Sequence, residues 1–374
     1  MSEKPARSID QNLADTIDQL TREGSVDFHL HSSFSDGSET PQTIVKLMIG
    51  AGLRAFALTD HDTTKGIVQA AALLEKLSAA APLLHTASPD RLDREKPRSD
   101  LHTCFRETIF PSSLPLFFPG VELSCEFEGQ EVHVLAYFRK KEEAFKLRPY
   151  LRTLGRSREK RNRQMIERLR ELGFAISMEE LRSLAENKVG RVHMGLWLMQ
   201  HGAVQDMSEA FERYLGRDGL AYIPRERQSV AESIQHVHEA GGVAFIAHPH
   251  EYGWCDEKAS EQGKESSKET KEANGRNYEN SRKGYEKMRL SPSPAKRKDF
   301  HLKTEKSLLS KKIERLLPCG LDGIEAFHSQ ASPEARALAL AVAEQFSLPV
   351  CAGSDWHGSN RPGRDFYKKG STFF

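Results

Sequence analysis

Short apolar runs alternate with helical patterns along much of the chain. Residues 26–30 alternate between apolar and polar positions, which is typical of a short buried strand. Residues 40–52 have helical spacing with Pro41 in the first turn, and residues 55–58 form the next apolar run. This succession predicts a parallel α/β arrangement. The rhythm returns in strand-like runs over 117–123, 131–138, 243–247, 323–326 and 349–352, and in helical patterns over 229–240, 306–317 and 333–346.

Several segments interrupt this rhythm. Residues 1–25 are expected to form a frayed amphipathic lead-in, and residues 366–374 a C-terminal tail. An insertion over residues 78–114 is rich in Ala, then in charge, then in Ser and Pro. A second insertion, residues 256–305, is charged and has too few apolar residues to fold, so we expect it to be disordered or loosely helical. Helical patterns predict a cap subdomain over 146–228, between barrel parts at 26–145 and 229–365.

Composition narrows the class of protein. The 374 residues are 38% hydrophobic and 29% charged, enough for one large domain with insertions or two ordinary ones. A net charge of +1 argues against a general polyanion binder. No apolar run approaches the about 18 residues of a membrane span, and no signal peptide is evident. The five cysteines are scattered, which favours a reducing compartment, so we expect a cytoplasmic protein. We also expect it to bind no membrane and to need no obligate protein partner. The oligomeric state stays open.

Histidine and carboxylate residues recur where the apolar runs end. His29 and His31 leave the same face of the first strand, as a two-ligand clamp for a metal would require. Alone, such a pair is weak, because many histidines simply alternate on a strand. The carboxyl ends of parallel strands gather at one mouth, so residues far apart in sequence are expected to converge there. The other candidates are Asp36, His61, Glu122, His133, His248, Asp355 and His357.

This set of residue types favours a phosphoesterase that uses two or three metals. One metal lowers the pKa of a water molecule while its neighbours bind the phosphate oxygens, and a bridging carboxylate keeps the ions about 3.5–4 Å apart. No phosphate-binding loop or dinucleotide motif competes with this interpretation. Taken singly, His133 or His248 is more often a hydrogen-bonded structural histidine, so the hypothesis depends on the joint pattern.

The order of the motifs points to a known family. The chain contains His29-x-His31, Ser35-Asp36-Gly37, Thr59-Asp60-His61, Gly120-Val121-Glu122 and His133, then Ala247-His248-Pro249 and Gly353-Ser354-Asp355-Trp356-His357-Gly358. This order resembles the polymerase and histidinol phosphatase (PHP) family from residue 26 to about residue 364, apart from the insertions. The resemblance implies a distorted (β/α)7 barrel with a metal cluster at its C-terminal mouth.

The resemblance also implies how the ligands are shared. By this likeness one metal is held by His29, His31, Glu122 and Asp355; Glu122 bridges to a second, held also by His133 and His248; and Asp36, His61 and His357 bind a third. All nine positions carry side chains able to bind a metal, which favours an active enzyme.

The helical subdomain narrows the branch. Gly190-Arg191-Val192-His193 and Ala221-Tyr222-Ile223-Pro224 resemble the cap of nucleoside 3′,5′-bisphosphate phosphatases and 5′-to-3′ exoribonucleases of the RNase AM type. Their motif is usually Gly-Arg-Pro-His, and its Arg and His contact substrate phosphate, which implies this role for Arg191 and His193. Arg156 or Arg161, in the basic helix over 156–172, are further candidates, although that helix face is equally compatible with plain solvation.

The resulting hypothesis is a metal-dependent phosphoesterase acting on a nucleotide, such as a 3′,5′-bisphosphate, or on a short RNA from its 5′ end. Its cofactors would be two or three divalent ions, Mn²⁺ first, with Fe²⁺, Zn²⁺ or Co²⁺ as alternatives. One rival is a histidinol-phosphatase-like enzyme, which the Gly-Arg-x-His motif disfavours. A polymerase-associated exonuclease is more distant, because no polymerase domain follows in this chain. A third rival is a regulatory module that binds metals without turnover, docking partners through the charged insertion.

Overall fold

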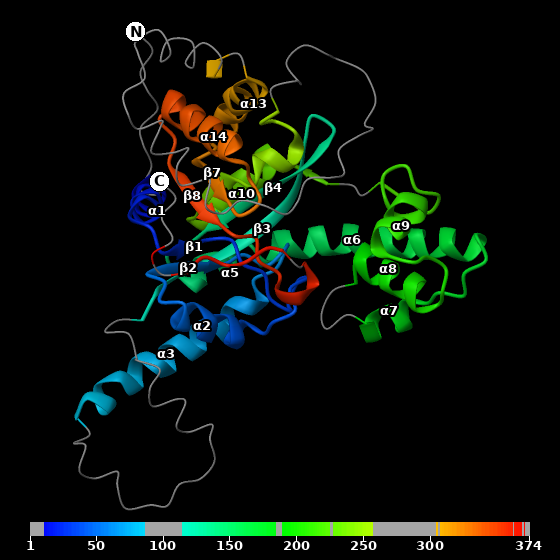
Figure 1. Cartoon of the computed structure of the whole chain (residues 1–374), viewed down its shortest axis with the longest axis horizontal. Coiled ribbons are helices and arrows are strands. Elements are labelled where there is room, and N and C mark those ends of the chain that lie inside the picture. Colours follow the sequence, from blue (N-terminus) through cyan, green and yellow to red (C-terminus); the bar gives the residue numbers. More distant parts are fainter. Residues whose placement is uncertain are drawn as a thin grey trace, which may run out of the picture.

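A curved sheet at the centre of the molecule forms a nearly closed barrel (Figure 1). The computed structural model describes residues 11–86, 114–184, 189–224, 227–256 and 304–370, apart from residues 306, 362 and 369. The strand order is β1-β2-β3-β4-β6-β7-β8, with β5 paired to β3. The two ends of this order meet, because the N–H of Phe28 donates to the carbonyl of Ala352 at 2.8 Å. The strands are β1 (Val26–Asp27), β2 (Ala55–Leu58), β3 (Leu116–Phe127), β4 (Gln130–Tyr137), β5 (Gln228–Ser229), β6 (Val243–Ile246), β7 (Gly323–His328) and β8 (Val350–Gly353).

The expected α/β barrel is confirmed, with one strand running against the parallel arrangement. Strand β4 pairs antiparallel with both β3 and β6. A two-residue turn joins β3 to β4, and both of its residues, Glu128 (φ 53°) and Gly129 (φ 76°), have the positive φ that tight hairpins need. Because β4 is reversed, His133 near its beginning lies at the same mouth as the ends of the parallel strands.

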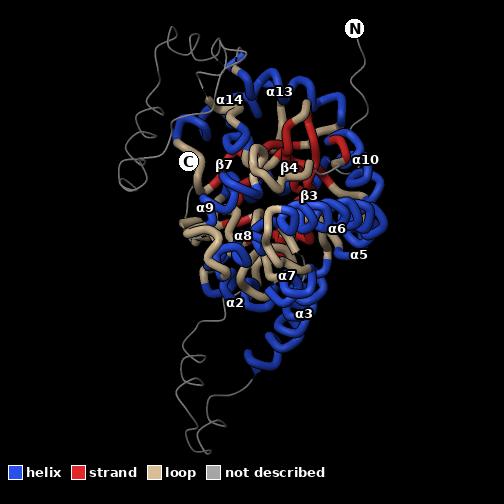
Figure 2. The backbone as a smooth tube through the Cα atoms, turned by 90° about the vertical axis from the view of Figure 1, so that its right-hand side faces the viewer, coloured by secondary structure: helices blue, strands red, loops and turns tan. Residues whose placement is uncertain are grey.

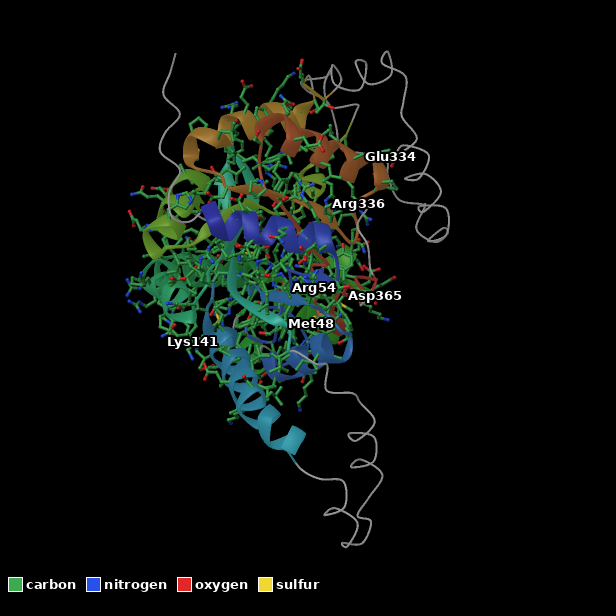
Figure 3. All side chains as sticks on the ribbon, turned by 90° about the vertical axis from the view of Figure 1, so that its left-hand side faces the viewer. Met48, Arg54, Lys141, Glu334, Arg336 and Asp365 are labelled. Carbon is green, nitrogen blue, oxygen red and sulfur yellow. The ribbon has the colours of Figure 1, made fainter. Side chains whose placement is uncertain are left out.

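Helices cover the outside of the barrel. Helix α1 lies against β8, α10 against β6, and α14 against β7 (Figures 1 and 3). Helices α10 and α14 lie where the sequence pattern predicts helices, whereas α1 lies in the segment expected to be frayed. The barrel helices are α1 (Gln11–Glu23), α2 (Pro41–Gly50), α3 (Lys65–Thr86), α5 (Lys141–Lys146), α10 (Val230–Ala240), α13 (Leu308–Leu316) and α14 (Pro333–Phe346), with 3-10 turns η3 (Pro249–Tyr252), η5 (Leu317–Cys319) and η6 (Gly358–Asn360).

The expectation of a frayed lead-in over residues 1–25 is wrong for α1. Leu13 and Ile17 are fully buried against the barrel, because the apolar face of this amphipathic helix covers the strands. Asp18 also accepts a hydrogen bond from the backbone N–H of Val350 in β8, at 2.9 Å. Helix α3 likewise continues past residue 78, where an insertion was expected. The rest of that insertion, residues 87–113, and residues 257–303 of the charged insertion lie outside the described residues.

A block of helices stands to one side of the barrel and has its own hydrophobic core (Figures 1 and 2). Tyr150 and Leu154, near the start of the long helix α6, pack in the barrel core, whereas Met165 and Leu169 pack in the second core. This shared helix fixes the block against the barrel. No helix in the described part of the chain is long and apolar enough to cross a membrane. The block consists of α6 (Arg148–Glu171), α7 (Met178–Leu184), α8 (Arg191–Gln200), α9 (Met207–Ala210) and the π-helical turn η2 (Phe211–Leu215).

Gly353, the last residue of β8, leaves room for residues of the two neighbouring segments, His29 after β1 and Glu325 on β7. A Cβ added there would lie 2.2 Å from the Cβ of His29 and 2.4 Å from Oε1 of Glu325. Both neighbours are buried and held by other contacts, so the backbone has to shift. We expect Gly353→Ala to lower the free energy of unfolding by about 1–3 kcal/mol, measured by urea unfolding.

Gly50, at the end of α2, provides a matched control, because nothing lies within 4 Å of a Cβ added there. Gly50→Ala should leave stability unchanged or raise it by up to about 1 kcal/mol, since Ala favours the helix. Equal effects of the two substitutions would contradict the close packing between β8 and the first strand.

Candidate metal centre

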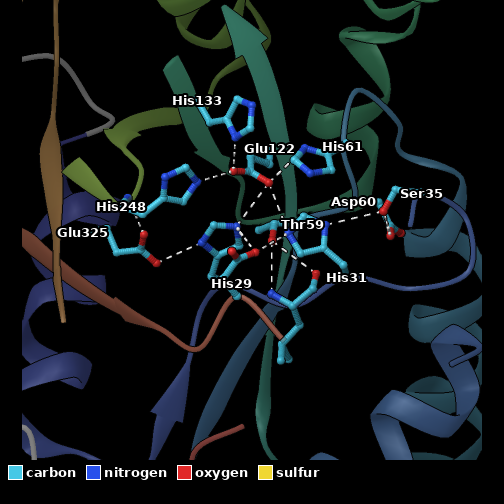
Figure 4. Close-up of polar contacts among 12 residues, drawn as sticks. His29, His31, Ser35, Thr59, Asp60, His61, Glu122, His133, His248 and Glu325 are labelled. Atoms are coloured by element: carbon cyan, nitrogen blue, oxygen red, sulfur yellow. Dashed lines mark hydrogen bonds and ion pairs between the residues drawn. The ribbon is translucent and has the colours of Figure 1, made fainter. Parts of the chain in front are cut away.

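The carboxylate of Glu122, on β3, lies at the centre of a ring of imidazoles (Figure 4). Its Oε2 is 3.0–3.2 Å from three ring nitrogens, and its Oε1 is 2.8–3.0 Å from two more. The side chain is fully buried. Five imidazoles therefore share one carboxylate, and they come from four different segments of the barrel, because His29 and His31 belong to the same one. The rings of His29, His31 and His61 face Oε2, and those of His133 and His248 face Oε1.

Two further carboxylates complete the cluster. Asp355 follows β8, and its Oδ1 lies 3.1 Å from Nε2 of His31 and 3.4 Å from Nε2 of His29. Asp36 lies nearer the rim, with its Oδ1 3.2 Å from Nε2 of His357. The structure thus brings all nine residues of the proposed ligand set together at one mouth.

The side chains fall into overlapping groups whose candidate ligand atoms lie within 4.8 Å of one another. Two of these groups contain the ligand sets that the family resemblance implies for the first and the third metal. The group for the third metal contains His31 in addition. A third joins Glu122 to His133 through His61, while His248 approaches Oε1 of Glu122 at 3.0 Å. The groups are His29, His31, Glu122 and Asp355; His31, Asp36, His61 and His357; His61, Glu122 and His133; and His248, Glu251 and Asp355.

Backbone strain collects at this mouth. His248 (φ 24°) and Asp355 (φ 53°), just past the ends of β6 and β8, have positive φ, as does Asp62 (φ 50°) beside His61. Such conformations cost non-glycine residues about 1–3 kcal/mol each and persist where the surroundings impose them. The strain turns these side chains inward at the strand ends.

Hydrogen bonds behind the rings decide which imidazole nitrogen faces the centre. Nδ1 of His29 lies 2.9 Å from Oε1 of Glu325, and because a carboxylate only accepts, Nδ1 carries the proton. Nε2 of His29 is then the atom that faces Glu122, and it can bind a cation once it has lost its proton. The carbonyl of Asp355 orients His357 in the same way, at 2.7 Å from its Nδ1. Buried acceptors of this kind are typical behind metal-binding histidines.

Glu325 is the main functional residue that sequence reasoning did not place. It lies on β7 and is fully buried, and besides holding His29 its Oε2 accepts the backbone N–H of His248 at 2.6 Å. One carboxylate therefore orients two candidate ligands. An acidic residue inside the apolar run predicted over residues 323–326 is the signal that could have found it.

Burial and neighbouring charges shift the pKa values of the histidines in different directions. Burial alone would raise the pKa of Glu122, but the surrounding histidines, first His61 and His29, hold it well below its usual range. Burial lowers the pKa of His29, yet Glu325 and Glu122 outweigh it and raise that pKa to about 10. Burial lowers the pKa of His61 to about 4 and that of His357 to about 3. The carboxylates thus favour the charged form of His29, whereas burial favours the neutral form of His61 and His357.

The residues fit divalent cations. Nε2 of His29, His31 and His357, Oε2 of Glu122 and Oδ1 of Asp36 are buried without a hydrogen-bond partner among the described residues. Lone pairs of nitrogen and oxygen that converge in this way repel one another unless a proton or a cation lies between them. Imidazole with carboxylate suits Mn²⁺, Fe²⁺, Zn²⁺ and Co²⁺.

A neighbouring group, His250, Glu251 and His328, does not fit a metal as well. The backbone N–H of Gln330 donates to Nδ1 of His328 at 3.1 Å, so the neutral ring carries its proton on Nε2. That N–H points toward Oδ2 of Asp355, 3.7 Å away. His328 therefore turns an N–H, and not a lone pair, toward the centre.

Two aspartates beside His61 shape the mouth. Asp60 accepts hydrogen bonds from the backbone N–H and hydroxyl of Ser32 and from the hydroxyl of Ser35, which fixes the loop that carries Asp36. Asp62 pairs with Arg158 of α6, 2.5 Å away. Among the basic residues of α6, then, Arg158 reaches the mouth, whereas Arg156 is exposed and Arg161 is buried within the helical block.

The cap residues Arg191 and His193 begin α8. The Arg191 guanidinium lies over the rings of Phe211 (5.5 Å) and Tyr222 (6.0 Å), and burial lowers its pKa against the charge of Glu131. The N–H of Gly190 donates to Nδ1 of His193 at 3.1 Å, so the neutral ring presents Nε2–H. Burial lowers the pKa of His193, while the negative charge of Asp36 acts to raise it. The cap residue His193 therefore interacts electrostatically with Asp36 at the barrel mouth. Val192, in place of the usual proline, is exposed and does not interrupt α8.

Comparisons with known proteins agree with this fold and cluster. The family model described as PHP domain matches residues 27–87, which confirms the resemblance seen in the motifs. The chain is 29% identical over 226 residues to a 5′-3′ exoribonuclease of Haemophilus influenzae, covering 60% of this chain and 69% of the relative. It is 28% identical over 230 residues to a 3′,5′-nucleoside bisphosphate phosphatase of Chromobacterium violaceum, covering 61% and 68%. The matches span about two thirds of each relative.

A solved structure shares the architecture over nearly the whole chain. It is a Bifidobacterium adolescentis protein assigned as a metal-dependent phosphoesterase, with a TM-score of 0.60, 24% identity and coverage of 92% of both chains. At this identity the likeness establishes the fold alone.

Removing the carboxylate behind His29 should weaken metal binding without removing a ligand. We expect Glu325→Gln to raise the dissociation constant for Mn²⁺ about 10–100-fold, as loss of an orienting partner typically does. Calorimetric titration of metal-stripped protein measures this. The exposed Glu334→Gln on α14 is the matched control (Figure 3). Unchanged affinity in Glu325→Gln would show that Glu325 does not orient the centre.

The raised pKa of His29 gives metal binding a pH dependence. Below about pH 10 His29 is protonated on both nitrogens, so a cation at Nε2 displaces one proton. We expect affinity to rise with pH by about tenfold per unit on this account, and proton release to appear as a dependence of the binding enthalpy on the buffer. In Glu325→Gln the release at neutral pH should diminish, since Glu325 raises this pKa. A binding enthalpy independent of the buffer in the wild type would contradict the protonated state of His29.

Proposed function

We propose that this chain, which carries a PHP domain, is a metal-dependent phosphoesterase that hydrolyses nucleotide phosphates. The observation that carries this is the carboxylate of Glu122 shared by five imidazoles from four segments. A catalytic centre for phosphoryl transfer needs several cations close together, and a shared carboxylate is how proteins hold them so. The names of the relatives, an exoribonuclease and a bisphosphate phosphatase, support the same reaction class.

The proposed cofactors are two or three divalent cations, Mn²⁺ first. When bound, such cations lower the pKa of water and offset the negative charge of a phosphoryl group. The chain contributes the rest. Burial of His29, His31 and Glu122 keeps bulk water from the inner ligands, and Glu325 fixes the ring of His29 in one orientation. The more exposed Asp36 and His61 form the side through which a substrate enters.

The proposed substrate carries a second phosphate, which the cap binds. Arg191 offers a permanent positive charge whose plane is held by two aromatic rings, and His193 offers an Nε2–H. Both begin α8, where unpaired backbone N–H groups also favour an anion. A nucleoside 3′,5′-bisphosphate, or the 5′ end of a short RNA with its next phosphodiester, places one phosphate at the metals and another at the cap.

The direct test is phosphate release by purified, Mn²⁺-loaded protein from adenosine 3′,5′-bisphosphate, AMP, histidinol phosphate and a short 5′-phosphorylated RNA. Turnover of the bisphosphate or the RNA, abolished in His248→Ala, supports the proposal. Turnover of histidinol phosphate alone overturns the nucleotide assignment. Metal binding without turnover of any of the four would identify a binding module instead.

Removing the cap charge should act on binding of the second phosphate. We expect Arg191→Ala to raise KM for the bisphosphate about tenfold or more, because a charge-assisted hydrogen bond is lost. The value of kcat should change little, and AMP, without the second phosphate, should be hydrolysed as by the wild type. Steady-state kinetics with both substrates measures this.

Arg182→Ala is the matched control, since Arg182 lies on α7 of the same helical block but is exposed, 3.6 Å from Glu159. It should leave both substrates unaffected. Equal losses with AMP and bisphosphate in Arg191→Ala would show that Arg191 supports the fold of the cap and does not recognise the second phosphate.

A further inference from the structure

The residues that follow β8 cross the mouth and are fixed on both sides of it. The side chain of Asn360 donates to the carbonyl of Asp36 at 2.9 Å. Further along, Phe366 packs edge-on against Trp356, with ring centroids 5.4 Å apart. The carbonyl of Gly363, between them, accepts a hydrogen bond from the side chain of Gln330 at 2.9 Å. Expected as the end of the barrel and a simple tail, this segment is part of the site.

Two arginines of this segment point at the carboxylates of the metal centre, and they differ in their surroundings. Arg364 is 16% exposed and is held between Glu251, at 2.7 Å, and Oδ2 of Asp355. Both of its partners are carboxylates, so its position is fixed. Arg361 is 39% exposed and lies 3.1 Å from Oδ2 of Asp36 and 3.6 Å from Oδ2 of Asp355.

Arg361 contacts the outer oxygens of both aspartates. The inner oxygens, Oδ1 of Asp36 and of Asp355, face the histidines. The two aspartates belong to different candidate cation groups, so the guanidinium lies across the junction between them. A guanidinium has five N–H donors in a planar fork, and the two carboxylates engage only part of it. The side chain is 39% exposed, so the remaining donors are accessible to a ligand.

We propose that Arg361 is a phosphate-positioning residue, which binds a non-bridging oxygen of the substrate phosphate. This inference rests on the proposed function and adds a residue to it. An anion that spans two cation groups lies directly beneath a guanidinium held across them, and the planar fork matches phosphate oxygens. Arg364 in turn holds Asp355 and the segment in place. The reacting phosphate is then recognised by Arg361 and the second phosphate by Arg191.

Inorganic phosphate is the probe that isolates this role. Calorimetry of the Mn²⁺-loaded wild type and Arg361→Ala should show phosphate affinity reduced about tenfold or more in the variant, because a charge-assisted contact is lost. The metal content per chain, measured by elemental analysis, should be the same in both proteins. In kinetics, KM should rise for every phosphate ester, AMP included. Arg361→Lys, which keeps the charge but not the fork, should recover part of the affinity.

Arg54→Ala is the matched control, since Arg54 precedes β2 at the opposite end of the barrel and pairs at the surface with Glu23 (Figure 3). It should bind phosphate as the wild type does. Unchanged phosphate affinity in Arg361→Ala overturns the inference, and so does a loss of affinity that merely parallels a loss of metal. Because phosphate binding is measured separately, absence of turnover in the wild type overturns the proposed function alone.

Discussion

A buried carboxylate that no single partner satisfies governs this structure. Glu122 has two oxygens and five imidazoles around them, and burial excludes the water that would otherwise solvate its charge. Only positive charge at the centre, from protons or cations, makes the arrangement favourable. The barrel supplies the geometry, since strands from distant parts of the chain end at one mouth, and reversed β4 brings His133 to the same place.

The hydrogen-bond partners on the outer side of the imidazoles determine which ring nitrogen faces the centre. Glu325 and the carbonyl of Asp355 each accept a ring N–H, which turns the opposite nitrogen of His29 and of His357 toward the centre. At His328 a backbone N–H donates to the ring instead, so the neutral ring turns its own N–H toward Asp355, 3.7 Å away. Two imidazoles close in space thus have opposite roles, decided by one hydrogen bond each.

Much of this was readable in the sequence, and the rest required three dimensions. The strand β2 and helix α14 were predicted to within a residue of their observed ends, and the nine ligand candidates do converge, because strand ends in a barrel share a mouth. Helix α1 was wrongly expected to be frayed, because its apolar face is stabilised only by packing against β8, which is distant in sequence. The roles of Arg158 and Arg361 could not be predicted from the residues around them in sequence. Each pairs with a carboxylate that is distant in sequence and that only the fold brings close.

We propose that Glu122 is the ligand shared between the cations. Counting metal ions per chain, by elemental analysis of Mn²⁺-loaded wild type and Glu122→Gln, tests it most directly, with circular dichroism to establish that both are folded. An amide keeps the shape of the side chain but cannot bridge two cations. We expect two or three ions in the wild type and at most one in the variant, held by the group around Asp36. Equal numbers in the two proteins, or none in the wild type, would contradict the claim.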